Sequence, residues 1–232
     1  MGWAKPFKQR RLDKNFHYFH LYHSLLSCLR NKQGENIMKQ VSVYLAGPDI
    51  FRNDAVEFAE EQKAICRGYG LEPQHPFDNN LEIKELGPEF RADIYAADIK
   101  QMIACDAIIA NVNSFRGVEP DGGTAFEVGW FAGFNAALRV LKAAYPQKRI
   151  YCFCDDTLEY RERVLRAGYI TDMKQDIDKD GLTISIFDMN VNLMIQVAAE
   201  EEGAFLMNGF EDCLKRIVAD RDAGLFEDKA AA

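Results

Sequence analysis

The chain has 232 residues, of which 48% are hydrophobic and 28% charged, a globular composition that excludes wholesale disorder. The formal net charge of −8 argues against general DNA or RNA binding, because phosphate binding requires a basic surface. No apolar run approaches the roughly 20 residues of a membrane-spanning helix, which excludes an integral membrane protein. The six cysteines form no CxxC pair and no Cys/His cluster, so we expect a reduced, cytoplasmic protein with no metal site and no cofactor.

The charge is unevenly distributed along the chain. Residues 1–37 carry a net charge of +5, which leaves −13 for the rest. This segment has no sustained helical or strand period, and we expect a poorly ordered extension to a domain formed by residues 38–232. Three interpretations of the segment stay open: an organellar targeting segment, a basic arm that contacts an acidic partner, or an extension ahead of a natural start at Met38.

The rest of the chain alternates short apolar runs with helical segments. We expect strands at 41–46, 71–75, 107–112 and 149–154, and helices at 54–69, 88–104, 124–144, 192–202 and 210–219. Residues 172–181, rich in Asp and Lys, are predicted to form a surface loop. Strands that are apolar on both faces indicate a parallel sheet covered on two sides. The predicted fold is therefore a single α/β, Rossmann- or flavodoxin-like doubly wound domain with a mainly parallel sheet.

Ligands of such sheets bind at the carboxyl ends of the strands, which directs attention to loops 47–53, 75–80 and 113–123. The third loop contains Gly122 and Gly123 ahead of a helix, a pair that often cradles phosphate. Nearby carboxylates would repel a phosphate, so we expect a neutral, hydroxyl-rich or basic-nitrogen ligand; these are Asp49, Glu119, Asp121 and Glu127. Such carboxylates suit glycosidic chemistry, in which one attacks a sugar carbon and another protonates the leaving group.

Each candidate residue also has a structural interpretation. Thr124 and Glu127 fit a capping box, in which Glu127 would bond the N-cap backbone. The same position lies in the positive field of a helix N-terminus, which would keep a nucleophilic carboxylate ionised. Taken singly, Asp98 is typical of a solvated helix residue, Tyr44 of a core residue and Asp121 of a turn residue.

The order of the motifs is more specific than any one residue. YLAGP at 44–48 ends a strand, PFD at 76–78 follows the next strand, and Asp98 lies in the following helix. DGGTAFEVG at 121–129 and NLMI at 192–195 come later. This ordered set resembles the nucleoside 2-deoxyribosyltransferase family, from about residue 41 to the 190s.

The resemblance implies a role for each matched residue. Glu127 would be the nucleophile that attacks C1′ of a 2′-deoxynucleoside, and the resulting deoxyribosyl ester would be resolved by a second base with net retention. Asp98 would exchange a proton with the base, and Tyr44 would position the nucleophile. Asp121 would hold sugar hydroxyls, and Asn192 would reach into a neighbouring subunit's site. Further substrate contacts are expected from Gly47, Phe51, Asp78 and Gly123.

The sequence departs from the family pattern in two places. The loop between Asn113 and Asp121 is long and includes Phe115 and Arg116, which would reshape the base pocket. The C-terminal tail also extends beyond the end of shorter family members, which puts any role for a terminal carboxylate in doubt.

Two other functions stay open. An N-glycoside hydrolase of (deoxy)nucleosides or their 5′-monophosphates would use water in place of the acceptor base, although Asp49 in the first loop argues against a 5′-phosphate. A non-enzymatic nucleotide-sensing module is the second alternative, against which the presence of Glu127 and Asp121 argues.

The expected partners are small molecules, namely 2′-deoxynucleosides and free bases, together with a second copy of the chain. Apolar residues surround nearly the whole helix expected at 124–144, and such a helix must be buried on all sides. We therefore expect a homo-oligomer, at least a dimer, with shared active sites. The alternative is that helices after Asn192 cover the outer face within one chain.

Overall fold

The computed structural model describes residues 40–79, 81, 88–143, 145–184 and 187–227. These residues belong to one compact unit, Lys39–Ala232. The basic segment 1–37 and the domain boundary that follows it lie outside the described residues, so both stay predictions. Within the described ranges, no helix combines the length and the apolar character needed to cross a membrane.

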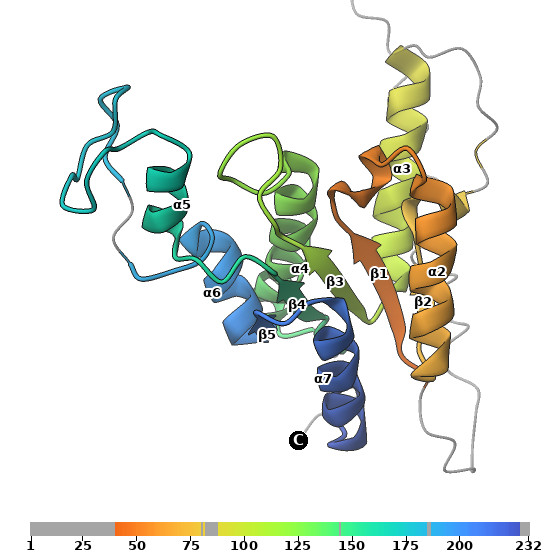
Figure 1. Ribbon diagram of the computed structural model, residues 1–232. Helices are drawn as coiled ribbons and strands as arrows, with labels where there is room; N and C mark the ends of the chain where they lie inside the picture. Colours follow the sequence, from red (N-terminus) through yellow and green to blue (C-terminus); the bar gives the residue numbers. More distant parts are fainter. Residues whose placement is uncertain (1–39, 80, 82–87, 144, 185–186, 228–232) are drawn as a thin grey trace, which may run out of the picture. The chain divides into compact units, whose positions relative to one another are not determined.

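Five strands form one sheet, which is parallel throughout (Figure 1). The strands are β1 (Ser42–Ala46), β2 (Glu72–Gln74), β3 (Ala107–Asn111), β4 (Arg149–Phe153) and β5 (Gly203–Leu206). Their order in the sheet is β2-β1-β3-β4-β5. This is the flavodoxin-like order, in which the chain reverses its direction of winding between β1 and β3. The predicted fold class is confirmed.

Helices cover both faces of the sheet. They are α2 (Ala55–Gly68), α3 (Pro88–Ala104), α4 (Gly122–Leu141), α5 (Tyr160–Arg166), α6 (Leu193–Glu202) and α7 (Phe210–Asp222). Two short 3-10 helices, η1 (Pro48–Phe51) and η2 (Pro76–Asn79), follow β1 and β2. Helices α3, α4 and α6 lie on one face of the sheet, and α2 and α7 lie on the other (Figure 1). Each group contributes side chains to the core on its own face.

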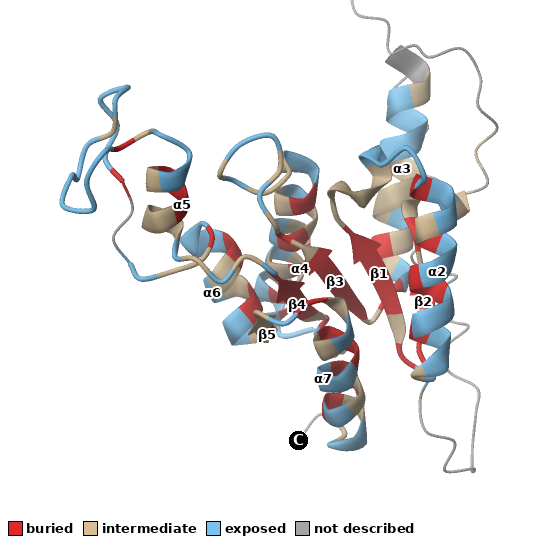
Figure 2. Ribbon diagram, viewed as in Figure 1, coloured by how far each residue is buried: buried red, intermediate tan, exposed pale blue. Residues whose placement is uncertain are grey.

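The alternation of side chains along each strand explains why both faces are apolar. On β1, Tyr44 packs in the core beneath α3, α4 and α6, whereas Val43 and Leu45 pack in the core beneath α2 and α7. All three are buried, and the sheet is the most deeply buried layer (Figure 2). Each buried aliphatic or aromatic side chain stabilises the fold by about 1.5–3 kcal/mol.

Two elements were missed by the sequence prediction. One is α5, whose segment YRERVLR is mostly charged and lacks an apolar period. The other is the edge strand β5, a short GAFL segment that begins at a glycine immediately after α6. Residues 172–181 contain no helix or strand, as expected, apart from a bridge between Ile177 and Thr183.

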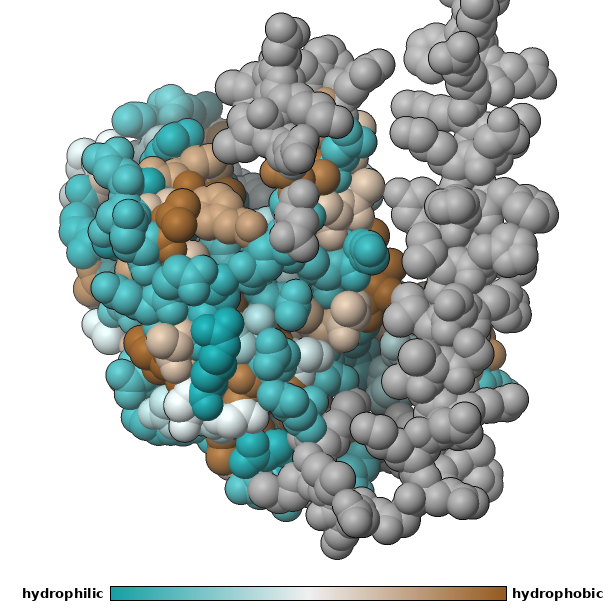
Figure 3. Space-filling model, turned by 90° about the vertical axis from the view of Figure 1, so that its right-hand side faces the viewer, coloured by the Kyte–Doolittle hydropathy of each residue, from teal (hydrophilic) through white to brown (hydrophobic). Residues whose placement is uncertain are grey.

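The face shown in Figure 3 is mainly hydrophilic, with smaller separate hydrophobic areas.

The helix α4 begins earlier than expected, and the predicted capping box is wrong. Asp121 is the N-cap, and its Oδ2 accepts a hydrogen bond of 3.0 Å from the backbone N–H of Thr124. Thr124 is therefore inside the helix and cannot be its cap. Glu127 consequently lies in the second helical turn and bonds elsewhere.

One side of α4 is buried and the other is not. Val128, Phe131 and Leu138 face the core, while Phe126 is 50% exposed and Val140 81% exposed. The alternative in which later helices cover the outer face holds only in part, because α6 does pack against α4.

Candidate active site

Tyr44 and Glu127 form the centre of the site. Tyr44 lies on β1 with its ring fully buried, and its hydroxyl donates a hydrogen bond of 2.8 Å to Glu127 Oε1. Glu127 comes from α4, which follows β3, the strand next to β1 in the sheet. The bond therefore spans the switch point between β1 and β3, where sheets of this order bind ligands.

The surroundings of Glu127 favour its neutral form. Burial raises the pKa of the Glu127 carboxyl to about 7, and the negative charges of Asp98 and Asp121 add to this rise. The hydrogen bond from Tyr44 acts in the opposite direction. The expectation that the helix N-terminus would keep this carboxylate ionised stays a prediction, and burial acts against it in the second turn.

Asp98 lies on α3, half-buried, and it faces the same centre. Its Oδ1 is buried and has no hydrogen-bond partner within the described ranges. Burial raises the pKa of Asp98 to about 6, while a hydrogen bond with the Asn79 side chain lowers it. A carboxyl with an unpartnered buried oxygen is suited to hold a proton and transfer it to a ligand.

Asn79 is a site residue that the sequence analysis missed. It ends η2, directly after Asp78, and it is the residue of this loop that acts on Asp98. The only signal in the sequence was its position in a loop already expected at the ligand edge of the sheet.

Asp78, the residue predicted from this loop, is engaged elsewhere. Its Oδ1 pairs with Lys63 Nζ at 2.5 Å, and its Oδ2 accepts a hydrogen bond of 2.9 Å from the backbone of His75. These contacts fix η2 against α2, so the structure gives Asp78 a local structural role. Contact with substrate stays a prediction for this residue.

Asp121 closes the N-terminus of α4 with its own carboxylate. Thr124 donates to Asp121 Oδ2 through its backbone N–H and, at 3.3 Å, through its hydroxyl. A Cβ at Gly123 would lie 2.9 Å from the same oxygen, so a glycine leaves room for the cap. The helix end is thus occupied by a negative charge, which opposes phosphate binding there.

Gly47 allows a close approach between the chain after β1 and the end of β3. A Cβ at Gly47 would lie 2.8 Å from the Cβ of Asn111. Asn111 also donates a hydrogen bond of 2.9 Å to Asp49 Oδ2. Asp49 is therefore used to hold the first loop, and Glu119 likewise accepts a bond of 2.6 Å from the Tyr160 hydroxyl. Of the three acidic residues grouped with Glu127 from the sequence, Asp121 is the one whose charge acts on its pKa.

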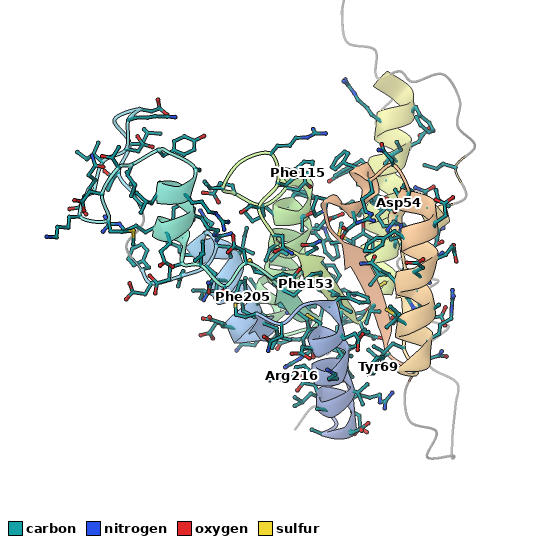
Figure 4. All side chains as sticks on the ribbon, in the orientation of Figure 1. Asp54, Tyr69, Phe115, Phe153, Phe205 and Arg216 are labelled. Carbon is teal, nitrogen blue, oxygen red and sulfur yellow. The ribbon has the colours of Figure 1, made fainter. Side chains whose placement is uncertain are left out.

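Phe51 contacts the long loop that departs from the family pattern. The rings of Phe51 and Phe115 stack with their centroids 5.1 Å apart and an interplanar angle of 17°. The guanidinium of Arg116 lies over both rings, 4.6 Å from the Phe115 centroid and 5.2 Å from the Phe51 centroid. Figure 4 shows Phe115 on the loop ahead of α4, on the side toward η1.

Asn192 lies apart from the Tyr44–Glu127 pair. It is exposed and is the N-cap of α6, where its Oδ1 accepts a hydrogen bond of 3.0 Å from the backbone of Met194. It lines an open cavity of about 400 Å³ together with Glu119 and Tyr160.

The side-chain chemistry of the site is carboxylate chemistry. The described ranges hold no group of three or more His, Cys, Asp or Glu side chains arranged for a metal ion. The five cysteines within these ranges are free and buried. The arrangement offers a carboxylate held by a tyrosine, and a second carboxyl able to carry a proton.

Comparison with known proteins finds the same fold in two solved structures. Over 77% of the chain and 97% of the other protein, the fold matches a 2-deoxyribosyltransferase from Leishmania mexicana with a TM-score of 0.55 and 28% sequence identity. A conserved protein from Enterococcus faecalis V583 shares the fold, with a TM-score of 0.51 and 15% identity over 79% of the chain and 99% of its own.

A curated relative is more similar in sequence but is matched only in part. An uncharacterized protein of Schizosaccharomyces pombe is 37% identical over 116 residues, which are 46% of this chain and 53% of that protein. The chain thus spans about half the length of this relative. The model of the family described as nucleoside 2-deoxyribosyltransferase matches residues 43–194, more than half of the chain. The chain therefore belongs to the nucleoside 2-deoxyribosyltransferase family.

Proposed function

We propose that this protein transfers 2-deoxyribose between nucleobases, by a retaining double displacement that serves nucleoside salvage. The observation that carries the proposal is the Tyr44–Glu127 hydrogen bond of 2.8 Å at the β1/β3 switch point, with Asp98 beside it. Family membership and the similarity to the Leishmania mexicana 2-deoxyribosyltransferase support it.

In the first half-reaction, an ionised Glu127 oxygen attacks C1′ of the deoxynucleoside. The C1′–N glycosidic bond breaks, and its electron pair goes to the base. Asp98, in its protonated form, donates a proton to the departing base, which is otherwise a poor leaving group. The products are a free base and an ester between deoxyribose C1′ and Glu127.

In the second half-reaction, a ring nitrogen of the acceptor base attacks the same C1′. The C1′–O bond of the ester breaks, and the carboxylate of Glu127 is regenerated. The proton that the acceptor nitrogen loses goes to Asp98, which is then ready for the next cycle. Two inversions at C1′ give net retention.

Burial raises the pKa of both carboxyls, to about 7 for Glu127 and about 6 for Asp98, so between these values the pair carries one proton. The reactive form is the one with that proton on Asp98, and the hydrogen bond from Tyr44 stabilises the ionised Glu127 of this form. Asp121, as the cap of α4, is expected to hold a sugar hydroxyl and to disfavour a 5′-phosphate.

The direct test is base exchange. Incubation with 2′-deoxyinosine plus adenine should yield 2′-deoxyadenosine, which chromatography detects. A parallel incubation with thymidine plus adenine shows whether pyrimidine nucleosides are donors as well. Glu127→Ala should abolish the exchange while the circular dichroism spectrum is retained. Release of base from a 5′-monophosphate without any acceptor base, faster than exchange, would replace the transferase with the hydrolase alternative.

We also propose that the protein works as a homo-oligomer with shared sites. The outer side of α4 and the start of α6 leave large apolar side chains exposed, including Phe126 at 50% and Met194 at 74%. Asn192 caps α6 beside Met194, and no hydrogen bond among the described residues joins it to Glu127. A second copy that covers this surface would bring Asn192 to a neighbouring site.

A further inference from the structure

The stack of Phe51, Phe115 and Arg116 is a built feature of the loop that precedes α4. Arg116 has a backbone φ of 52°, a left-handed conformation that arginine adopts rarely. Other contacts hold the loop in this form: Phe115 N donates to Glu119 O at 2.9 Å, and Ser114 Oγ donates to Val118 O at 3.0 Å. The loop therefore presents Arg116 in a set position.

The stack lies at the ligand edge of the sheet. Phe51 ends η1, the turn that follows β1, and Phe115 follows β3 (Figure 4). Strand β1 carries Tyr44, and β3 is followed by α4, the helix that carries Glu127. The rings and the guanidinium thus belong to the two loops that follow β1 and β3 at the switch point, the edge at which sheets of this order bind ligands.

The chemistry of the stack favours a flat ligand with acceptors on its edge. Phe51 remains 51% exposed although its ring already stacks on Phe115, so it offers an apolar surface to a further planar ring. A guanidinium that lies over an aromatic ring keeps its N–H donors in its own plane, available to a coplanar neighbour. A tetrahedral phosphate would gain nothing from the two rings. A nucleobase can stack on the exposed ring and accept hydrogen bonds from the guanidinium.

We propose that Arg116 selects 6-oxopurines, hypoxanthine and guanine, as the exchanged bases. The proposal rests on the transferase function above and names its base class. Their O6 and N7 are adjacent acceptors that match the two-pronged donor of arginine. Adenine carries an amino donor at C6, which would face the N–H groups of Arg116 and leave both sides unpaired. Arg116 is thus a specificity-determining residue.

The test measures kcat/KM for hypoxanthine and for adenine as acceptors, with 2′-deoxyguanosine as the common donor, because in a double displacement the kcat/KM of the acceptor does not depend on the donor. Arg116→Asn is the informative variant, because asparagine accepts a positive φ and the loop keeps its shape. We expect the hypoxanthine value to fall about tenfold to a hundredfold, the discrimination of one bidentate arginine–base pair, and the adenine value to change less than about threefold. Arg116→Lys, which keeps the charge but loses the fork, should lose the preference as well.

Arg52→Asn is the matched control. Arg52 is another exposed cation near the same turn, but it lies over Phe58 at 4.1 Å and pairs with Asp54 at 2.8 Å. This variant should keep the wild-type ratio of kcat/KM for hypoxanthine to kcat/KM for adenine. Equal losses for both bases in Arg116→Asn, or an unchanged ratio, would overturn the proposal. So would a preference retained in Arg116→Lys.

Failure of the transferase function and failure of the proposed role of Arg116 give different results. A wild-type protein that exchanges no base with any acceptor would refute the transferase function itself. A wild-type protein that exchanges hypoxanthine and adenine equally well would leave the function intact and refute only the role of Arg116. If Arg116→Asn and Arg116→Lys differ only with 5′-monophosphates as donors, the arginine serves a phosphate and the proposal is wrong.

Discussion

The hydroxyl of Tyr44 donates to Glu127 Oε1 at 2.8 Å, from a position 83 residues earlier in the sequence. Tyr44 stays protonated under ordinary conditions, because burial and the charge of Glu127 both raise the pKa of its hydroxyl. It therefore acts as a fixed donor and not as a proton carrier. Its bond aligns one oxygen of Glu127 and leaves the other for chemistry.

Tyr44→Phe removes this donor with little change in packing. The Tyr44 bond lowers the pKa of Glu127, so its loss should raise that pKa and move the acidic limb of kcat/KM to higher pH. We expect kcat to fall about tenfold to a hundredfold, as for one hydrogen bond to a charged group. A pH profile between 5 and 9 measures both effects. An acidic limb that does not move would show that Tyr44 serves packing alone.

Glu127→Gln should stabilise the fold while it abolishes exchange. The folded pKa of Glu127 is raised from 4.5 to about 7, so its ionisation destabilises the fold as the pH rises through this window. At pH 8 the free energy of unfolding of the variant should exceed that of the wild type by up to about 3 kcal/mol. At pH 5 the difference should be less than about 1 kcal/mol. Urea denaturation at the two pH values measures the difference. Equal effects at both would contradict the raised pKa.

Asp98→Asn tests the proton carrier. With pKa values near 6 for Asp98 and 7 for Glu127, kcat/KM should be bell-shaped with its maximum between them, the two apparent values belonging to the pair. The alkaline limb reports loss of the proton from the pair and should disappear in the variant. We expect exchange to fall by about 10² to 10⁴. A variant that keeps the bell shape would place the proton elsewhere.

Two substitutions at Asp121 separate its cap from its charge. Asparagine caps a helix as well as aspartate does, so Asp121→Asn should leave the free energy of unfolding nearly unchanged. Asp121→Ala should lose about 1 kcal/mol. Both remove a charge that raises the pKa of Glu127, so both should move the acidic limb to lower pH. An activity loss in Asp121→Ala alone would assign the residue to the cap only.

Mixing of two inactive variants tests the shared site. Glu127→Ala lacks the nucleophile, and Asn192→Ser lacks the amide but keeps an N-cap for α6. After reversible dissociation, the mixture should regain part of the activity, because some sites would combine an intact Glu127 with an intact Asn192. A fully active monomer by light scattering would contradict the shared site, and so would a mixture that exchanges subunits but regains nothing.

The central strands could be predicted because strands buried on both faces consist of continuous apolar residues. VSVYLA, AIIANV and RIYCFC are continuous apolar runs, as expected of strands covered on both faces. The edge strand β5 has no such signal, since GAFL is short and begins at the glycine that ends α6. Helix α5 is stabilised by local polar contacts such as the bond of 3.0 Å from Glu159 N to Glu162 Oε2, which leave no apolar period.

The site was predictable in its residues but not in its contacts. Local spacing favoured Thr124 as the cap for Glu127, whereas Asp121, three residues earlier, takes that position. The partner of Glu127 is Tyr44 on strand β1, 83 residues earlier, and no local pattern records a contact of that range. The same holds for Asn79, whose interaction with Asp98 depends on how η2 meets α3.

The distance in sequence between Tyr44 and Glu127 has a consequence for the order of folding. Local helices form quickly, but a parallel pair such as β1 and β3 must close a long loop before its contacts are gained. The hydrogen bond between Tyr44 and Glu127 can form only after that closure. In a refolding experiment, helical circular dichroism should therefore recover before base exchange does, and the return of catalysis would mark the docking of α4 beneath β1.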